Sequence, residues 1–104
     1  MEKITRSYKV DGAQMIYEMP KEVDHHVAKD MCQEIDMLVE SYRIKELILD
    51  FAQTEFMDSS GIGVVIGRSK TMHFHSGNIA AMNVGKRVDT IFKSAGLYKI
   101  IQMK

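Results

Sequence analysis

The sequence contains a single cysteine, Cys32, so it can form no internal disulfide bond. Such cysteine usage is typical of a protein from a reducing compartment. The amino-terminal segment MEKITRSYKV lacks the apolar core of a signal peptide. No apolar run approaches the roughly 20 residues that a membrane-spanning helix requires. These absences predict a cytoplasmic protein that does not enter a membrane.

The chain also has no excess of charge of either sign, because 14 basic residues balance 14 acidic ones. Proteins that bind nucleic acid usually carry a surplus of positive charge, which displaces counterions from the phosphates. No block of basic residues compensates for the zero net charge. Direct binding of DNA or RNA is therefore not expected.

The length of 104 residues suits one compact domain and is too short for two. Apolar residues make up 45% of the chain and charged residues 27%, which is ordinary for a soluble globular protein. A chain of this size buries roughly 60–70% of its unfolded surface, so one hydrophobic core suffices. We therefore expect a single domain over residues 1–104.

Strand patterns occur in five places. Residues 4–10 and 14–19 are expected to form a hairpin, because Asp11-Gly12 suits a tight turn and Pro20 cannot continue the second strand. The apolar run within residues 46–51 does not alternate, which predicts a central strand buried on both faces. Two more short segments are expected to complete the sheet: a strand at residues 79–82 and a final strand or turn within 97–103.

Helical periodicity marks three segments. Residues 25–41 follow Asp24, a favoured N-cap residue, and residues 60–72 form the second segment. The third contains residues 88–95, and Gly96 is placed to end it. The apolar face of the first helix is expected to consist of Val27, Met31, Ile35, Leu38 and Tyr42.

The order of these elements is β-β-α-β-α-β-α, with a possible final strand. Strands that alternate with helices indicate a parallel sheet with right-handed crossovers, and the initial hairpin adds an antiparallel edge. We therefore expect an α/β fold with a mixed, mostly parallel sheet of four to five strands, packed with three or more helices.

The segment FMDSSGIGVVIGRSK, residues 56–70, combines an acid and two serines with a glycine-rich helix. A nucleotide P-loop requires GxxxxGK followed by Ser or Thr, but no lysine stands directly after Gly67. The dinucleotide fingerprint GxGxxG fails as well, because Ile66 stands at the third glycine position. We therefore expect no nucleotide cofactor.

Hydrolase chemistry at the two serines has little support. A nucleophile elbow reads GxSxG, whereas this chain reads Asp-Ser-Ser-Gly at residues 58–61. The adjacent histidines His25 and His26 do not share one helical face, so they are not placed to bind a metal together. We expect a protein that is not an enzyme and holds no metal, with a serine hydrolase as a weaker alternative.

Two interpretations of Ser59 follow from the residues alone. Serine is a favoured N-cap and Asp58 suits the positive end of a helix dipole, so both residues could serve capping only. Alternatively, the helix start could be a docking surface. Gly61 and Gly63 each cost a helix about 0.8–1 kcal/mol relative to alanine, and they leave room for a partner's backbone.

The segment FMDSSGIGVVIGR resembles the signature of the bacterial anti-sigma factor antagonists, which are single STAS domains of about this length. In those proteins, the serine immediately after the aspartate is phosphorylated by a partner that is both a kinase and an anti-sigma factor. By position that serine is Ser59, with Ser60 as its neighbour. Lys21 stands where members of the family commonly have glycine. Further similarity covers EVDHHVA at residues 22–28, LILDF at 47–51 and VDTIFKSAGLYKII at 88–101.

The resemblance implies a STAS-like fold and a phosphorylation-controlled switch in sigma-factor-dependent transcription. The unphosphorylated chain would bind an anti-sigma factor with serine kinase activity, phosphorylation would end that binding, and a serine phosphatase would restore it. The alternative is a STAS module that binds a small ligand or serves as a scaffold in a stress-signalling assembly. The residues implied in partner binding are Asp24, Asp58, Ser59, Ser60, Gly61 and Gly63.

Overall fold

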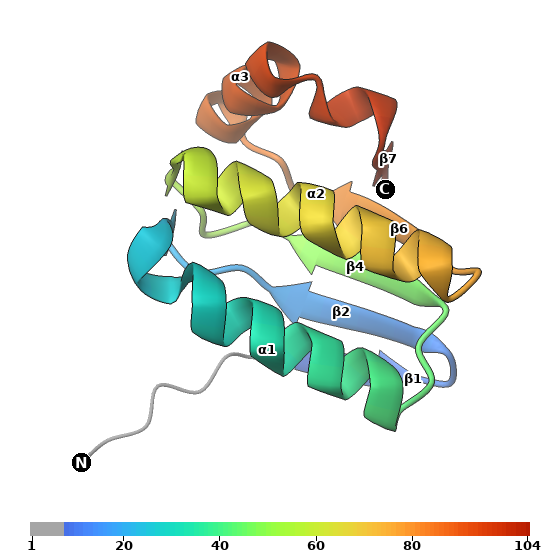
Figure 1. Cartoon of the computed structure of the whole chain (residues 1–104). Helices are drawn as coiled ribbons and strands as arrows, with labels where there is room; N and C mark the ends of the chain where they lie inside the picture. Colours follow the sequence, from blue (N-terminus) through green and yellow to red (C-terminus); the bar gives the residue numbers. More distant parts are fainter. Residues whose placement is uncertain (1–7) are drawn as a thin grey trace.

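The computed structural model describes residues 8–104, which form a five-stranded sheet with helices α1 and α2 side by side across one face (Figure 1). A separate pair of two-residue strands lies at the start of these helices. The strands are β1 Tyr8–Asp11, β2 Gln14–Glu18, β3 Glu22–Val23, β4 Glu46–Asp50, β5 Phe56–Met57, β6 Asn78–Met82 and β7 Gln102–Met103. The helices are α1 His25–Ser41, α2 Ser59–Phe74, α3 Lys86–Ala95 and the short 3₁₀ helix η1 Leu97–Lys99.

The main sheet has the strand order β1-β2-β4-β6-β7. The β1–β2 hairpin is antiparallel and the other neighbours are parallel, which confirms the expected mixed, mostly parallel sheet. Gly12 turns the hairpin with a φ of 61°, a conformation that glycine adopts without steric cost. Residues 4–7 of the expected first strand lie outside the described residues.

The helices agree closely with their periodic patterns. Helix α1 has the expected bounds and its N-cap is Asp24. Helix α3 ends at Gly96, whose left-handed φ of 70° allows the chain to turn away from the helix. Helix α2 extends beyond the expected residues 60–72 at both ends. No helix within residues 8–104 combines the length and the apolar character needed to cross a membrane.

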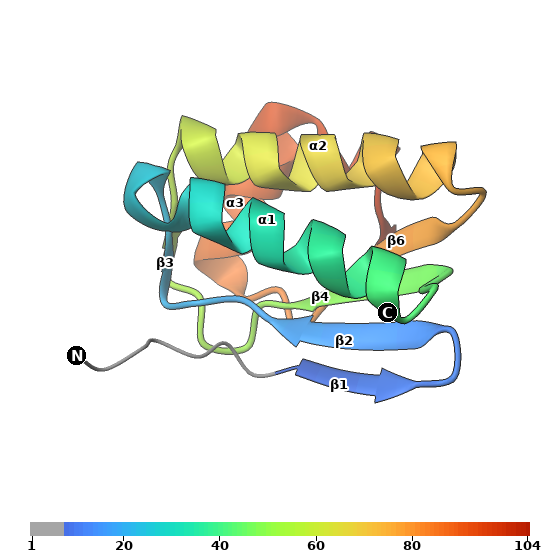
Figure 2. The same ribbon diagram turned by 60° about the horizontal axis from the view of Figure 1, so that its bottom comes forward.

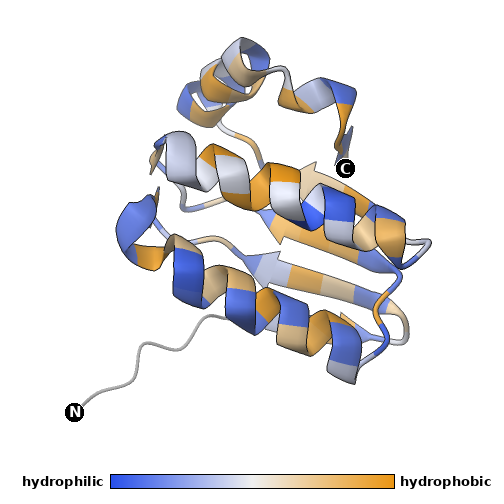
Figure 3. Cartoon of the chain, in the orientation of Figure 1, coloured by the Kyte–Doolittle hydropathy of each residue, from blue (hydrophilic) through white to orange (hydrophobic). Residues whose placement is uncertain are grey.

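The core lies between the sheet and the helices. Strand β4, apolar in Figure 3, is buried at all three central positions from Leu47 to Leu49, which confirms it as a central strand. The expected apolar face of α1 is wrong at one position, because Tyr42 lies beyond the end of the helix and is 49% exposed. The buried residues of α1 are Met31, Ile35, Leu38 and Val39.

Candidate functional site

Two short parallel strands place the beginnings of α1 and α2 beside each other (Figure 2). In this pair, Glu22 lies opposite Phe56 and Val23 opposite Met57. An aspartate follows each strand, and a helix begins at the residue after it. The pairing therefore brings together two N-caps, Asp24 and Asp58, that are far apart in the sequence.

Asp58 connects the two helix starts through both of its carboxylate oxygens. Its Oδ1 accepts hydrogen bonds from the backbone N–H groups of Ser60, at 2.8 Å, and Gly61, at 3.0 Å. Its Oδ2 accepts one from the backbone N–H of His25, at 3.2 Å, and lies 3.5 Å from Nδ1 of the same histidine. Asp58 thus caps α2 and also holds the first residue of α1.

The N-cap of α2 is therefore Asp58, and the capping role considered for Ser59 is wrong. Ser59 is the first residue of the helix and is exposed. Among the described residues, no group hydrogen-bonds to its side-chain hydroxyl. Ser60 is half-buried, and its N–H is bound to the cap. Because Asp58 binds the N–H groups of Ser60 and Gly61, the Ser59 hydroxyl is not used in capping and lies free at the surface.

The two glycines at this helix start have different surroundings. Gly61 is buried, and a Cβ atom built on it would lie 2.1 Å from the carbonyl oxygen of Val23. Its small size is required so that α2 can begin against the end of β3, a packing role that the sequence did not predict. Its contact with a partner stays a prediction. Gly63 is exposed, and a Cβ atom there would have nothing within 4 Å. A contact role for Gly63 stays a prediction.

Asp24 caps α1 in the same manner. Its Oδ1 accepts a hydrogen bond from the N–H of His26, at 2.9 Å, and lies 3.5 Å from Nδ1 of that histidine.

Lys21 lies just before β3, and its Nζ is 3.7 Å from Oε2 of Glu55. The backbone of Lys21 is not in the left-handed conformation that favours glycine. The local turn therefore does not require the glycine found there in similar proteins. Sequence reasoning missed the role of His25, because its bond to Asp58 depends on the pairing of β3 with β5.

The electrostatics of the site favour a charged Asp58. Partial burial by itself would raise the pKa of this carboxyl group, but the hydrogen bonds from Gly61, His25 and Ser60 outweigh it and lower the pKa below its ordinary value. The site therefore presents an anionic carboxylate next to a free hydroxyl. Within residues 8–104, no three histidine, cysteine, aspartate or glutamate side chains are grouped to hold a metal ion.

The lowered pKa of Asp58 predicts how stability depends on pH. A carboxyl group whose pKa is lower in the folded state stabilises the fold above its unfolded pKa of about 3.9. That contribution disappears as the pH falls through the lower folded value. We expect Asp58→Asn to reduce the melting temperature at pH 7 and to differ less from the parent at pH 3. Thermal melts across this range measure the effect, and a difference that is the same at every pH would contradict it.

The arrangement suits the addition of a group to Ser59. The hydroxyl is accessible, and the N-terminus of α2 offers a positive dipole end that tolerates a phosphate. Among the described residues, no histidine hydrogen-bonds to this hydroxyl.

Comparisons with known proteins point to one family. Residues 5–104 match the family described as STAS domain. The chain is 30% identical over 87 residues to the anti-sigma F factor antagonist of Paenibacillus polymyxa, an alignment that covers 84% of this chain and 74% of that protein. The structure of the unphosphorylated anti-sigma factor antagonist SpoIIAA gives a TM-score of 0.83 at 24% identity, covering 96% of this chain and 88% of that one. The phosphorylated form of SpoIIAA from Bacillus gives 0.75 at 23% identity, over 96% and 91% of the two chains.

Proposed function

The chain belongs to the STAS domain family, in the group of anti-sigma factor antagonists, and we propose that it binds an anti-sigma factor and thereby releases a sigma factor. We further propose that this partner is a serine kinase that phosphorylates Ser59. The observation that carries this proposal is the exposed Ser59 hydroxyl, which Asp58 leaves free by capping α2 itself. This function requires no catalytic residue in the chain itself.

The proposed docking surface consists of the two helix starts. Asp58 and His25 hold these starts together, so a partner would meet a preformed surface. Gly63 lies one turn into α2 and leaves this part of the helix without a side chain. A surface that is already ordered loses little conformational entropy on binding, which favours affinity.

Phosphorylation would act on this surface through charge. The kinase would transfer the γ-phosphoryl group of ATP to the Ser59 oxygen, with loss of the hydroxyl proton and release of ADP. The phosphate adds about −1.5 to −2 charges at pH 7, next to the Asp58 carboxylate. An unpaired charge buried in an interface costs roughly 2–5 kcal/mol, and each 1.4 kcal/mol or so corresponds to a tenfold loss of affinity.

The fold is expected to tolerate the phosphate. Asp58 already binds the N–H groups of Ser60 and Gly61, but the positive end of the α2 dipole still favours a negative charge at Ser59. The switch would therefore be local: partner binding changes while the domain remains folded. A serine phosphatase that removes the phosphate would restore binding.

Phosphorylation is expected at Ser59 and not at Ser60, because Ser59 is exposed whereas Ser60 is half-buried. The test incubates the parent, Ser59→Ala and Ser60→Ala with ATP and the purified cognate anti-sigma factor, followed by mass spectrometry of the peptide. The parent and Ser60→Ala should carry one phosphate, and Ser59→Ala none. A phosphate mapped to Ser60 would overturn the assignment. Absence of any phosphate would favour the ligand-binding or scaffold alternative.

A further inference from the structure

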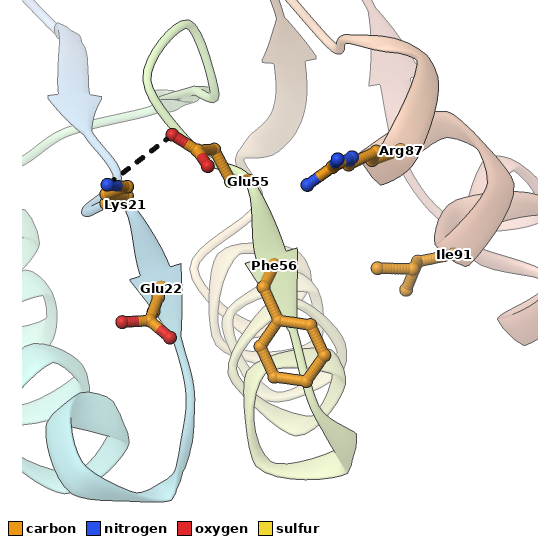
Figure 4. A pocket seen from close by; sticks show the side chains of 6 residues that line it. All are labelled: Lys21, Glu22, Glu55, Phe56, Arg87 and Ile91. Atoms are coloured by element: carbon orange, nitrogen blue, oxygen red, sulfur yellow. Dashed lines mark ion pairs between the residues drawn. The ribbon is translucent and has the colours of Figure 1, made fainter.

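A groove of about 470 Å³ lies beside the docking surface, between the β3–β5 pair and helix α3 (Figure 4). The small sheet that forms one wall is the same one that positions the two N-caps. Glu22 and Phe56, which lie opposite each other in it, precede Asp24 and Asp58 by two residues. The groove therefore begins two residues before each of the two N-caps. Its lining residues are Lys21, Glu22, Glu55, Phe56, Arg87 and Ile91.

The groove offers an apolar contact that the fold does not use fully. Phe56 on β5 is 47% exposed, although large aromatic side chains are usually well buried. Ile91 projects from α3 on the opposite side and is half-buried (Figure 4). Together they could contact one apolar side chain of a bound segment, as aromatic and aliphatic residues do at the centres of interfaces.

The groove has two basic and two acidic side chains, and the two that form no ion pair within residues 8–104 lie on opposite walls, Glu22 on β3 and Arg87 on α3. Lys21 and Glu55 are 3.7 Å apart and neutralise each other. Arg87, one helical turn before Ile91, forms no ion pair within residues 8–104, although Figure 4 shows it directed toward the β5 side of the groove. An arginine presents several N–H donors that match a carboxylate. The α3 wall is therefore complementary to an acidic side chain.

We propose that this groove is a second part of the interface with the anti-sigma factor, and that Arg87 selects the partner. It receives a segment that places an apolar side chain against Phe56 and Ile91 and a carboxylate against Arg87. This rests on the proposed function, but it assigns a separate role. The Ser59 surface switches binding, whereas the groove decides which anti-sigma factor is bound, because a charge that lacks its counterpart is penalised on desolvation.

The test measures binding kinetics of Arg87→Glu against the purified cognate anti-sigma factor, with Lys86→Glu as the matched control. Lys86 is the preceding residue of α3, is exposed and does not line the groove, so its reversal changes the net charge equally at the same helix end. We expect Arg87→Glu to weaken binding about tenfold or more, mainly through faster dissociation, which is the signature of a desolvated charge pair. Lys86→Glu should change affinity by less than about threefold, because rim charges act weakly.

A second variant, Phe56→Ala, tests the apolar contact. It should also accelerate dissociation, and a thermal melt shows whether the domain remains folded. If Arg87→Glu and Phe56→Ala both bind the anti-sigma factor as tightly as the parent, the groove is not part of the interface. The same conclusion follows if Arg87→Glu and Lys86→Glu weaken binding equally. Ser59→Asp, measured in the same series, separates the two claims. If it loses binding while the groove variants keep it, the groove inference fails and the proposed function stands.

Discussion

Replacing Ser59 by aspartate is expected to weaken binding to the anti-sigma factor by about tenfold or more, whereas Ser59→Ala should bind like the parent and resist phosphorylation. Aspartate places a second carboxylate beside Asp58 at the proposed interface, where like charge and desolvation both oppose binding. Alanine removes only a hydroxyl that has no partner among the described residues. Calorimetric titrations against the purified anti-sigma factor measure both effects.

Stability should hardly change in either variant. Ser59 is exposed and is not the cap of α2, so its replacement falls among surface substitutions, which usually alter the free energy of unfolding by less than about 0.5 kcal/mol. Ser41→Asp is a suitable control, because it adds the same charge at the exposed far end of α1. If Ser59→Asp binds as tightly as the parent, local charge blocking is wrong. If it loses binding together with its fold, Ser59 is a structural residue.

Gly61→Ala is expected to destabilise the domain strongly. The new methyl group would lie 2.1 Å from the Val23 carbonyl oxygen, so α2 would have to move away from β3. Overpacking of this kind costs about 1–3 kcal/mol or more. In a domain of this size, each kcal/mol lowers the melting temperature by roughly 4–8 °C. The displacement would also disturb Asp58, which binds Gly61 and His25, so partner binding should weaken too.

Gly63→Ala is the matched control, because the same substitution two residues later meets nothing within 4 Å. It should raise helix propensity by up to about 1 kcal/mol, so the melting temperature should stay equal or rise. Binding to the anti-sigma factor should nevertheless weaken, since a methyl group would stand on the docking surface. Thermal melts that show equal stability for Gly61→Ala and the parent would contradict the packing role. If Gly63→Ala binds the anti-sigma factor with unchanged affinity, Gly63 is not part of the interface.

The main sheet and its helices could be predicted from the sequence because their patterns are long enough to show a period. The helical periodicity of residues 25–41 predicted α1 together with its cap, and the apolar run within residues 46–51 predicted the central strand β4. Strands β3 and β5 could not be found in this way, since two residues carry no periodicity. The pairing of β3 with β5 depends on the tertiary fold, and it is this pairing that brings the two helix starts together.

The sequence points to residues 58–63 as the candidate site, and the structure changes the structural roles of some of its residues. Aspartate and serine are both favoured N-cap residues, so residue preference alone does not decide between the neighbours Asp58 and Ser59. In the structure the N-cap of α2 is Asp58. Gly61 and Gly63 look alike in the sequence, and only the approach of Val23 to one of them separates packing from exposure. Arg87 carried no signal, because its place beside Phe56 depends on how α3 packs.

The most direct test of the switch compares the unphosphorylated chain with the same chain fully phosphorylated at Ser59. Both forms are titrated by calorimetry against the purified anti-sigma factor, and both are melted to confirm that they are folded. We expect the unphosphorylated form to bind and the phosphorylated form to bind at least about tenfold more weakly, with similar melting temperatures. Equal affinity of the two folded forms would contradict a switch at Ser59.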